Sequence, residues 1–382
     1  MAQTIRGQKE LKAQVQDAGL CTGCGACVNL CPYQVFYHDR TIVLNACDIA
    51  AGRCHAFCPR TPVDLEELRS RFFVESDFTA EIGPVKAFYI TRAADAQLRR
   101  QAQHGGTVSA LMSLALQEGL IAAAVVAEGR DRLMHEGTTV RESQEVRKRA
   151  KSRFIVSPTI AEFNRTARGP SNRIGVVATP CQVFSLAKMR LKPELASGDN
   201  PIDKLKLVIG LFCGFTLDWA KLTGLLKGRT ELDAVTGMEV PPGEGVLEVY
   251  TVSGTLRFPM EDVTPLMREA CRYCIDTTAE YADLSVGSAR LSESWDVTRA
   301  WNQVVVRTRT GLDLINRARE RGVLEFREVP DGGLEALKTA ALQKKRASLK
   351  NLMEKSGSAG DLIYLDARDR VVAAWQQGGE HV

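Results

Sequence analysis

The chain has 382 residues, of which 45% are hydrophobic and 25% are charged, and these proportions exclude a disordered chain and a fibre. Its 50 basic and 46 acidic side chains leave a formal net charge of +4, and aromatic residues make up only 6%. We therefore expect no nucleic acid among its partners. The length suggests two or three domains.

The N-terminal segment is polar and mixed in charge, and it lacks the apolar stretch of a secretory signal. The best apolar run, residues 119–127, is only about half the ~20 residues of a membrane span. We therefore expect a cytoplasmic protein with no membrane span. The eleven cysteines are an odd number, and in a reducing compartment clustered cysteines are more typical of metal ligands than of disulfides.

Helices and strands are predicted to follow the cysteine-rich segment of residues 21–60. Residues 64–71 are predicted to form a helix or linker, and Gly83-Pro84 indicates a boundary within 75–85. The pattern then predicts strands at 85–91, 120–127, 173–178, 205–211 and 302–309, a hairpin at 246–258, and helices at 107–117, 311–321 and 334–355. Because the strands are continuously apolar and alternate with helices, we expect a largely parallel sheet covered on both faces.

Four of the cysteines form one compact motif, C-x2-C-x2-C-x3-C-P, at Cys21, Cys24, Cys27 and Cys31. This is the spacing of bacterial ferredoxins, in which the fourth cysteine ligates the other cluster of a pair. The small residues between the first three let backbone amides point at the sulfurs and stabilise an anionic cluster. A zinc knuckle also uses C-x2-C pairs, but not this 2-2-3 spacing before proline.

A second group, Cys47, Cys54 and Cys58, ends like the first in C-x3-C-P. The two-cluster rule assigns one [4Fe-4S] cluster to Cys21, Cys24, Cys27 and Cys58, and the other to Cys31, Cys47 and Cys54. The second set has three cysteines, with Ala51 where a middle cysteine is expected. Its cluster has a non-cysteine ligand such as Asp48, is a [3Fe-4S] species, borrows a cysteine from elsewhere, or is absent.

The last four cysteines, Cys181, Cys213, Cys271 and Cys274, are spread along the chain. Cys181 and Cys213 each follow a predicted strand, and the carboxyl ends of parallel strands are where ligands gather. With the C-x2-C pair they make a candidate four-thiolate site. The alternative is that two are buried apolar thiols and the pair is a redox dithiol.

The glycine pair Gly105-Gly106 precedes the helix predicted at 107–117, with Thr107 as its N-cap. Backbone amides at such a helix start can approach a diphosphate, and the helix dipole favours its negative charge. The pair lacks the G-x-G-x-x-G pattern, so on its own it also fits an ordinary turn.

Several segments resemble the beta subunits of coenzyme F420-reducing hydrogenase and F420-dependent formate dehydrogenase, and the input subunit of reduced-F420 dehydrogenase, which also carries a two-cluster ferredoxin module. The matching segments are residues 104–120, 151–154, 179–182, 211–213, 271–276 and 282–287. The resemblance covers residues 85–325. It implies an α/β (mixed α+β) domain that binds FAD and a [4Fe-4S] cluster at 85–325, with the ferredoxin-type iron–sulfur module at 1–75 in front of it. Residues 326–382, which the resemblance does not cover, are expected to form a helical extension.

The resemblance also implies site residues. The ligands of the cluster near the flavin are then Cys181, Cys213, Cys271 and Cys274. The positions that match flavin-contacting segments are Gly105, Gly106, Thr107, Lys151, Ser152, Arg153, Thr179, Gln182 and Gly287. Lys151 and Arg153 have the charge to neutralise phosphates, although such a basic run is often only a solvated face. No general base is expected, because the protein supplies positioning and tuning rather than acid–base catalysis.

The function implied is an oxidoreductase subunit that transfers electrons. A flavin exchanges both hydride and single electrons, so FAD would take hydride from, or give it to, coenzyme F420 or NAD(P)H and connect it to the clusters. The partner would be a hydrogenase, a formate dehydrogenase or a heterodisulfide-reductase-like complex, and the basic helix at 334–355 is a candidate docking surface. The alternatives are a flavin-free wiring subunit and a reductase of a chlorin or another organic substrate. Ser288, where the family often has Asp, leaves the hydride donor open.

Overall fold

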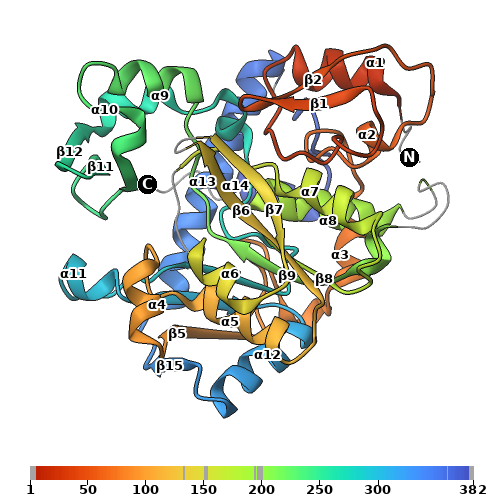
Figure 1. Ribbon diagram of the computed structural model, residues 1–382. Helices are drawn as coiled ribbons and strands as arrows, with labels where there is room; N and C mark the ends of the chain where they lie inside the picture. The colour runs from red at the N-terminus through yellow and green to blue at the C-terminus, as the bar shows by residue number, and fades with distance from the viewer. Residues whose placement is uncertain are drawn as a thin grey trace.

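A computed structural model describes residues 6–131, 134–149, 154–192, 195, 201–358 and 360–377. Among these residues, eight strands form the main sheet in the order β15-β5-β14-β13-β9-β8-β6-β7 (Figure 1). They are β5 Ala87–Ala93, β6 Ala123–Asp131, β7 Met134–Val140, β8 Ile174–Ala178, β9 Leu205–Leu211, β13 Leu284–Ser288, β14 Asn302–Val306 and β15 Leu324–Arg327. The predicted strands are all present, whereas the apolar pattern does not predict β7, β13 or β15.

The expectation of a largely parallel sheet is wrong, because only its centre is parallel. Strands β13, β9, β8 and β6 run parallel to one another, while β7, β14, β5 and β15 pair antiparallel. For example, β7 follows β6 after two residues, and so short a connection cannot supply the crossover of a parallel pair. The carboxyl ends of the parallel strands share one edge with the start of β14 and the end of β5, and we call it the carboxyl edge.

Helices cover both faces of the sheet (Figure 1). One face packs against α4 (Ala96–Gln101), α5 (Thr107–Gln117), α6 (Ser143–Lys148) and α12 (Arg309–Glu320), and the other against α7 (Thr159–Ala167) and α8 (Pro180–Leu191). Neighbouring residues such as Leu207 and Val208 enter opposite cores, as alternation along a strand requires. The predicted N-cap of α5 is wrong by one residue: Gly106 is the cap, and its φ of 79° suits glycine.

The cysteine-rich N-terminal module lies on the side of the sheet that α7 and α8 cover (Figure 1). Its elements are α1 Gln8–Leu11, the π-helix η1 Lys12–Gln16, β1 Gln34–Tyr37, β2 Arg40–Val43, α2 Arg53–Ala56, α3 Leu65–Phe72, η2 Glu75–Asp77, β3 Phe78–Thr79 and β4 Gly83–Pro84. Asn164 of α7 donates its side-chain amide to the carbonyl oxygens of Ala26 (3.1 Å) and Val28 (2.8 Å). This contact ties the first cysteine loop to the sheet domain.

The remaining elements form a hairpin lobe and a C-terminal helical layer. The lobe holds β10 Val235–Glu239, β11 Val246–Thr251 and β12 Gly254–Pro259 with α9 Trp219–Leu226 and α10 Met260–Val263, so the predicted hairpin is confirmed. Short helices are η4 Pro201–Lys204, η5 Leu232–Ala234, η6 Thr264–Leu266, η7 Glu269–Tyr273 and α11 Trp295–Thr298, and the C-terminal layer is α13 Gly333–Ser356 and α14 Arg370–Gln377. No helix within the described ranges is long and apolar enough to cross a membrane.

The C-terminal helices complete the core of the N-terminal module. Leu349 and Leu352 of α13 and Trp375 of α14 belong to one buried cluster with Leu11 and Leu68 near the start of the chain. The cysteine-rich segment has few apolar side chains of its own. The last part of the chain therefore supplies the apolar surface on which that segment packs.

Candidate iron–sulfur and flavin site

The first cysteine group gathers from the N-terminal loop and the end of α2. Cys21, Cys24 and Cys27 lie between η1 and β1, and Cys58 follows α2. Burial raises the pKa of the Cys27 thiol, and the charges of the other three thiols raise it further. The structure thus brings together the four cysteines that the two-cluster rule assigns to one cluster.

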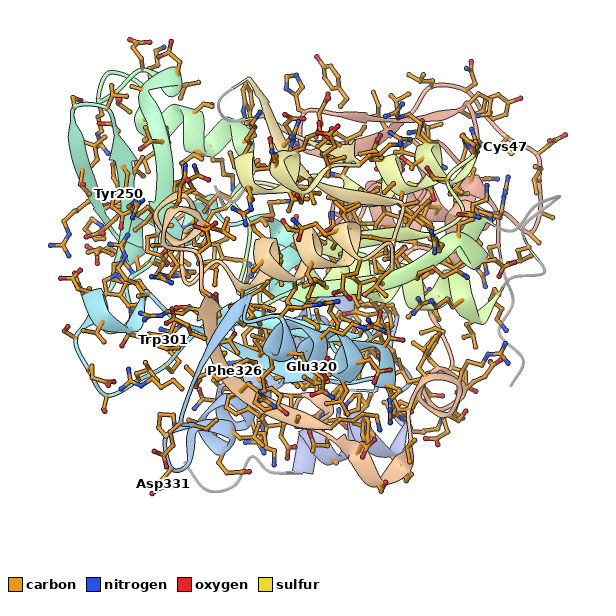
Figure 2. All side chains as sticks on the ribbon, turned by 60° about the horizontal axis from the view of Figure 1, so that its bottom comes forward. Cys47, Tyr250, Trp301, Glu320, Phe326 and Asp331 are labelled. Atoms are coloured by element: carbon orange, nitrogen blue, oxygen red, sulfur yellow. The ribbon has the colours of Figure 1, made fainter. Side chains whose placement is uncertain are left out.

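The second group, Cys31, Cys47 and Cys54, also lies in one neighbourhood. Burial raises the pKa of Cys54 to about 11, and the thiols of Cys31 and Cys47 are close enough to contribute. The Gln34 side chain lowers the same pKa, and its buried Nε2 finds no other acceptor among the described residues. Asp48, the suggested additional ligand, is exposed. Cys47 lies at the outer edge of the molecule, on the opposite side from Tyr250 of the hairpin lobe (Figure 2).

The third group meets at the carboxyl edge. Cys181 lies in the first turn of α8, directly after β8, and Cys213 lies two residues after the neighbouring parallel strand β9. Cys271 belongs to η7, and Cys274 directly follows the last residue of that helix as its C-cap. Burial raises the pKa of Cys213, and the thiols of the other three raise it further, so all four are neighbours. The structure therefore brings together the four cysteines of the third group, as the sequence predicts.

Side chains of helix α13 donate hydrogen bonds to backbone carbonyl groups of the third group. Lys344 donates its ammonium group to the carbonyl oxygens of Cys213 (2.7 Å) and Asp276 (3.0 Å), and Ser348 donates to that of Cys274 (2.8 Å). Burial alone would raise the pKa of Cys274, but the charges of Lys344 and Arg60 hold it below its ordinary value. The helix predicted as a candidate docking surface therefore has basic side chains directed at the cysteine loop of its own chain.

A cavity of about 130 Å³ opens at the carboxyl edge, and its walls carry the third group. It is lined by the four cysteines of that group, by Thr179, Gln182 and Lys344, and by Cys24 of the first group. The backbone nitrogen and the hydroxyl of Thr216 both lie 3.4 Å from the Cys271 sulfur. Donors to sulfur of this kind stabilise iron–sulfur clusters. Four thiols with such donors around one cavity fit a [4Fe-4S] cluster.

No three His, Cys, Asp or Glu side chains in the described part of the chain converge as ligands of a single metal ion. A cluster holds its thiolates farther apart than one ion does, because iron and sulfide lie between them.

The first and third groups are neighbours: the charge of Cys181 adds to burial in raising the pKa of Cys24. Two candidate cluster sites therefore lie next to each other across the boundary between the module and the sheet domain.

The predicted flavin positions fall into two sets along the carboxyl edge. Thr179 and Gln182 begin α8, where the Thr179 amide donates to the Gln182 side chain at 2.9 Å, and both line the cavity. Gly105 and Gly106 lie between α4 and α5, Thr107 is the first residue of α5, and Gly287 lies in β13. The predicted residues Lys151, Ser152 and Arg153 lie outside the described residues.

Asn302, which the sequence does not single out, connects the members of the second set. Its side chain accepts a hydrogen bond from the Thr107 amide (3.2 Å) and donates one to the Gly287 carbonyl (3.1 Å). A Cβ at Gly105 would lie 2.8 Å from the Asn302 Oδ1, so only glycine fits there. An asparagine at the start of a strand carries no distinct signal, and its role depends on the antiparallel pairing of β14 with β13 and β5.

Gly287 permits close packing, and this leads to a prediction. A Cβ at this position would clash with the ring of Phe212, whose neighbour Cys213 belongs to the third group. We expect Gly287→Ala to lower the free energy of unfolding by about 1–3 kcal/mol, because overpacking in a core displaces neighbours. Urea unfolding measures the effect.

The matched control is Gly224→Ala in α9, where an added methyl group meets open space. Alanine is favoured over glycine in a helix interior, so this variant should gain up to about 1 kcal/mol. Equal stability of the two variants would show that the Phe212 contact does not constrain residue 287.

Comparison with known proteins gives the family. The model of the coenzyme F420 hydrogenase/dehydrogenase beta subunit matches residues 88–162 with its N-terminal part and 171–332 with its C-terminal part, and a 4Fe-4S binding domain matches 15–37. The coenzyme F420 hydrogenase subunit beta of Methanothermobacter thermautotrophicus is 28% identical over 71% of this chain and 95% of its own length. A subunit of the F(420)H(2) dehydrogenase of Methanosarcina mazei is 23% identical over 90% of this chain and 94% of its own length.

A solved structure agrees with these matches. A chain of the F420-reducing [NiFe] hydrogenase complex from Methanosarcina barkeri superposes with a TM-score of 0.65 at 25% identity, over 72% of this chain and 94% of that one. The fold, the segments matched and the order of the domains point the same way. The chain therefore belongs to the coenzyme F420 hydrogenase/dehydrogenase beta subunit family and carries a 4Fe-4S binding domain in front of the segments that define the family.

Proposed function

We propose that this chain is an iron–sulfur electron-transfer subunit of an F420-linked oxidoreductase complex. In this proposal FAD exchanges hydride with a soluble carrier, coenzyme F420 or NAD(P)H, and single electrons pass through clusters to or from a partner oxidoreductase. The observation that carries it is the cavity at the carboxyl edge, which is lined by Cys24 of the first group together with the third. Adjacent cluster sites make a path for electrons out of the sheet domain.

The flavin would bind along the carboxyl edge. Bound FAD supplies the exchange between hydride and single electrons. Thr179 and Gln182 would contact it from the cavity, and Gly105 and Gly106 would let it approach the start of α5. Asn302 would position this second set, because it holds both the Thr107 amide and the Gly287 carbonyl. We assign Lys151, Ser152 and Arg153 to the same site on the family resemblance.

The second cysteine group is the proposed exit to the partner. Cys47 lies at the outer edge of the molecule (Figure 2), and the segment of residues 33–49 that contains it has exposed large apolar side chains. They are Tyr33, Tyr37, Leu44 and Ile49, with 37–61% of their surface exposed. Exposed apolar side chains clustered within one short segment are typical of a protein–protein contact. This surface suits a partner better than α13 does, because Lys345 of that helix is buried and Lys344 is half-buried with its ammonium group on the Cys213 carbonyl.

The partner would be another subunit of the same complex. Two of the relatives are named as subunits of a hydrogenase and of a dehydrogenase. By analogy we propose a hydrogenase, a formate dehydrogenase or a heterodisulfide-reductase-like complex for this chain. The direction of electron flow then depends on which redox couple the partner supplies.

The first test is the iron and flavin content after strictly anaerobic purification. We expect about one FAD with eleven or twelve irons per chain, the lower count corresponding to a [3Fe-4S] centre at the second group. About eight irons with FAD would leave the second group empty. Iron without flavin, even after reconstitution with FAD, would contradict hydride exchange and leave a subunit that only wires clusters together. Anaerobic bleaching by reduced F420, compared with NADH and NADPH, then identifies the carrier.

A further inference from the structure

Arg60 lies buried between the first and the third cysteine group. It follows the ligand candidate Cys58 by two residues, only 4% of its surface is exposed, and it lines the cavity that carries the third group. One terminal nitrogen of its guanidinium group donates to the Tyr364 hydroxyl at 3.0 Å, and the other donates to the Ala270 carbonyl at 3.2 Å. Its charge is therefore held in a fixed place by two segments that are distant from it in the chain.

No carboxylate in the described part of the chain forms an ion pair with this guanidinium group. Its Nε is also buried without a hydrogen-bond partner among the described residues. A buried charge with no counter-charge is costly, and proteins pair or neutralise such groups. The thiols of Cys274 and Cys181 line the same cavity as this guanidinium group and are close enough for their charge to act on it. The buried guanidinium group therefore requires a counter-charge, and no carboxylate among the described residues supplies it.

Two other buried cations, Arg69 and Lys188, can be compared with Arg60 by the partners that each one has. Arg69, with 5% of its surface exposed, has ordinary partners: Asp369 at 2.6 Å and Glu66 at 2.7 Å. Lys188, with 2% exposed, resembles Arg60 instead, because it contacts the carbonyl oxygens of Cys58 (2.7 Å) and Thr61 (2.8 Å). Arg60 and Lys188 thus lie beside the first cysteine group without a carboxylate partner among the described residues, while Arg69 of the same core has two carboxylate partners.

We infer that Arg60 is the counter-charge shared by the clusters of the first and third groups and that it raises the reduction potential of the third-group cluster. This inference rests on the proposed function, since it requires both clusters. A cluster held by four thiolates is anionic and gains one more negative charge on reduction, so a fixed positive charge beside it favours the reduced form. Arg60 would be a positioning residue that acts through the clusters and touches no hydride carrier.

The test is an EPR-monitored redox titration of the full chain with its clusters in place. The third-group signal is identified as the one that Cys271→Ala removes. We expect Arg60→Gln to retain its iron and to change the one-electron reduction equilibrium of that signal at least tenfold towards the oxidised form, a fall of about 59 mV. Arg60→Lys keeps the charge, and its midpoint should stay close to that of the wild type.

Arg69→Gln is the matched control, because it removes an equally buried arginine that has its own carboxylates. Its midpoint should not move. An unchanged midpoint in Arg60→Gln with full iron, or an equal fall in Arg69→Gln, would overturn the inference. If Arg60→Gln does not retain iron, Arg60→Lys decides: a wild-type midpoint supports a role for the charge, and a tenfold shift overturns it. Absence of the third-group signal in the wild type would instead contradict the proposed function, and this is seen before any variant is compared.

Discussion

Replacing Cys271 with alanine should remove about four irons per chain and slow the reduction of the N-terminal clusters about a hundredfold or more. Cys271 shares the cavity at the carboxyl edge with Cys181, Cys213 and Cys274. Without one of the four thiolates the cluster cannot be held, and the step between the sheet domain and the first group is lost. Iron assay gives the first number, and stopped-flow bleaching with the reduced carrier that acts on the wild type gives the second.

Thr216→Val is the control for this variant. It removes a hydroxyl that lies 3.4 Å from the Cys271 sulfur but keeps every cysteine, so its iron content should be that of the wild type. Flavin reduction by the carrier should persist in Cys271→Ala, because the proposed flavin contacts are intact. Full iron and wild-type bleaching in Cys271→Ala would show that the four thiols do not hold a cluster.

The second large effect is expected on stability, at Arg307. Its guanidinium group is 1% exposed and donates to the carbonyl oxygens of Ile82 (2.6 Å), Pro84 (3.0 Å) and Thr278 (2.9 Å), and to the Ser285 hydroxyl (2.8 Å). Arg307→Met leaves these buried acceptors without a donor. We expect the free energy of unfolding to fall by about 3–5 kcal/mol, measured by urea unfolding of the anaerobic protein.

The nearby Arg309 provides a contrast on the same segment of chain. Its side chain is 82% exposed and pairs only with Asp313, one helical turn away. Such surface pairs contribute little, so Arg309→Met should unfold at the wild-type urea concentration. If Arg307→Met also unfolded at the wild-type urea concentration, the hydrogen bonds of Arg307 would not be what joins β14 to the segment after the third cysteine group.

Cysteine spacing made most of the cluster site predictable. The candidate ligands Cys21, Cys24 and Cys27 are close in sequence, and their spacing is itself the geometric requirement of a cluster. The placement of Cys181 and Cys213 followed from one topological rule, since parallel neighbours bring their carboxyl ends to one edge. The apolar runs were equally informative about β8 and β9, whose side chains are buried on both faces.

Local pattern was less informative at the margins of the sheet. The antiparallel edge strand β15 is mostly half-buried, and residues 136–140 of the other edge strand, β7, range from exposed to buried, so both carry little apolar signal. The direction of β14 depends on how the chain returns from β13. The same limit applied to α13. Its lysines have the sequence of an exposed basic face, yet Lys344 and Lys345 point into the chain, where carbonyl groups of the cysteine loop accept their hydrogen bonds.

Ligand spacing and strand hydrophobicity are local properties, so the amino-acid order was enough to predict an iron–sulfur module in front of an α/β domain. The folded chain was needed to show that Arg60 lies beside Cys274, that Lys344 supports Cys213, and that Asn302 joins Thr107 to Gly287. Each of these contacts links segments that are distant in the chain or depends on backbone carbonyl groups. Every residue carries such a carbonyl, so only the folded arrangement shows which cation each one receives.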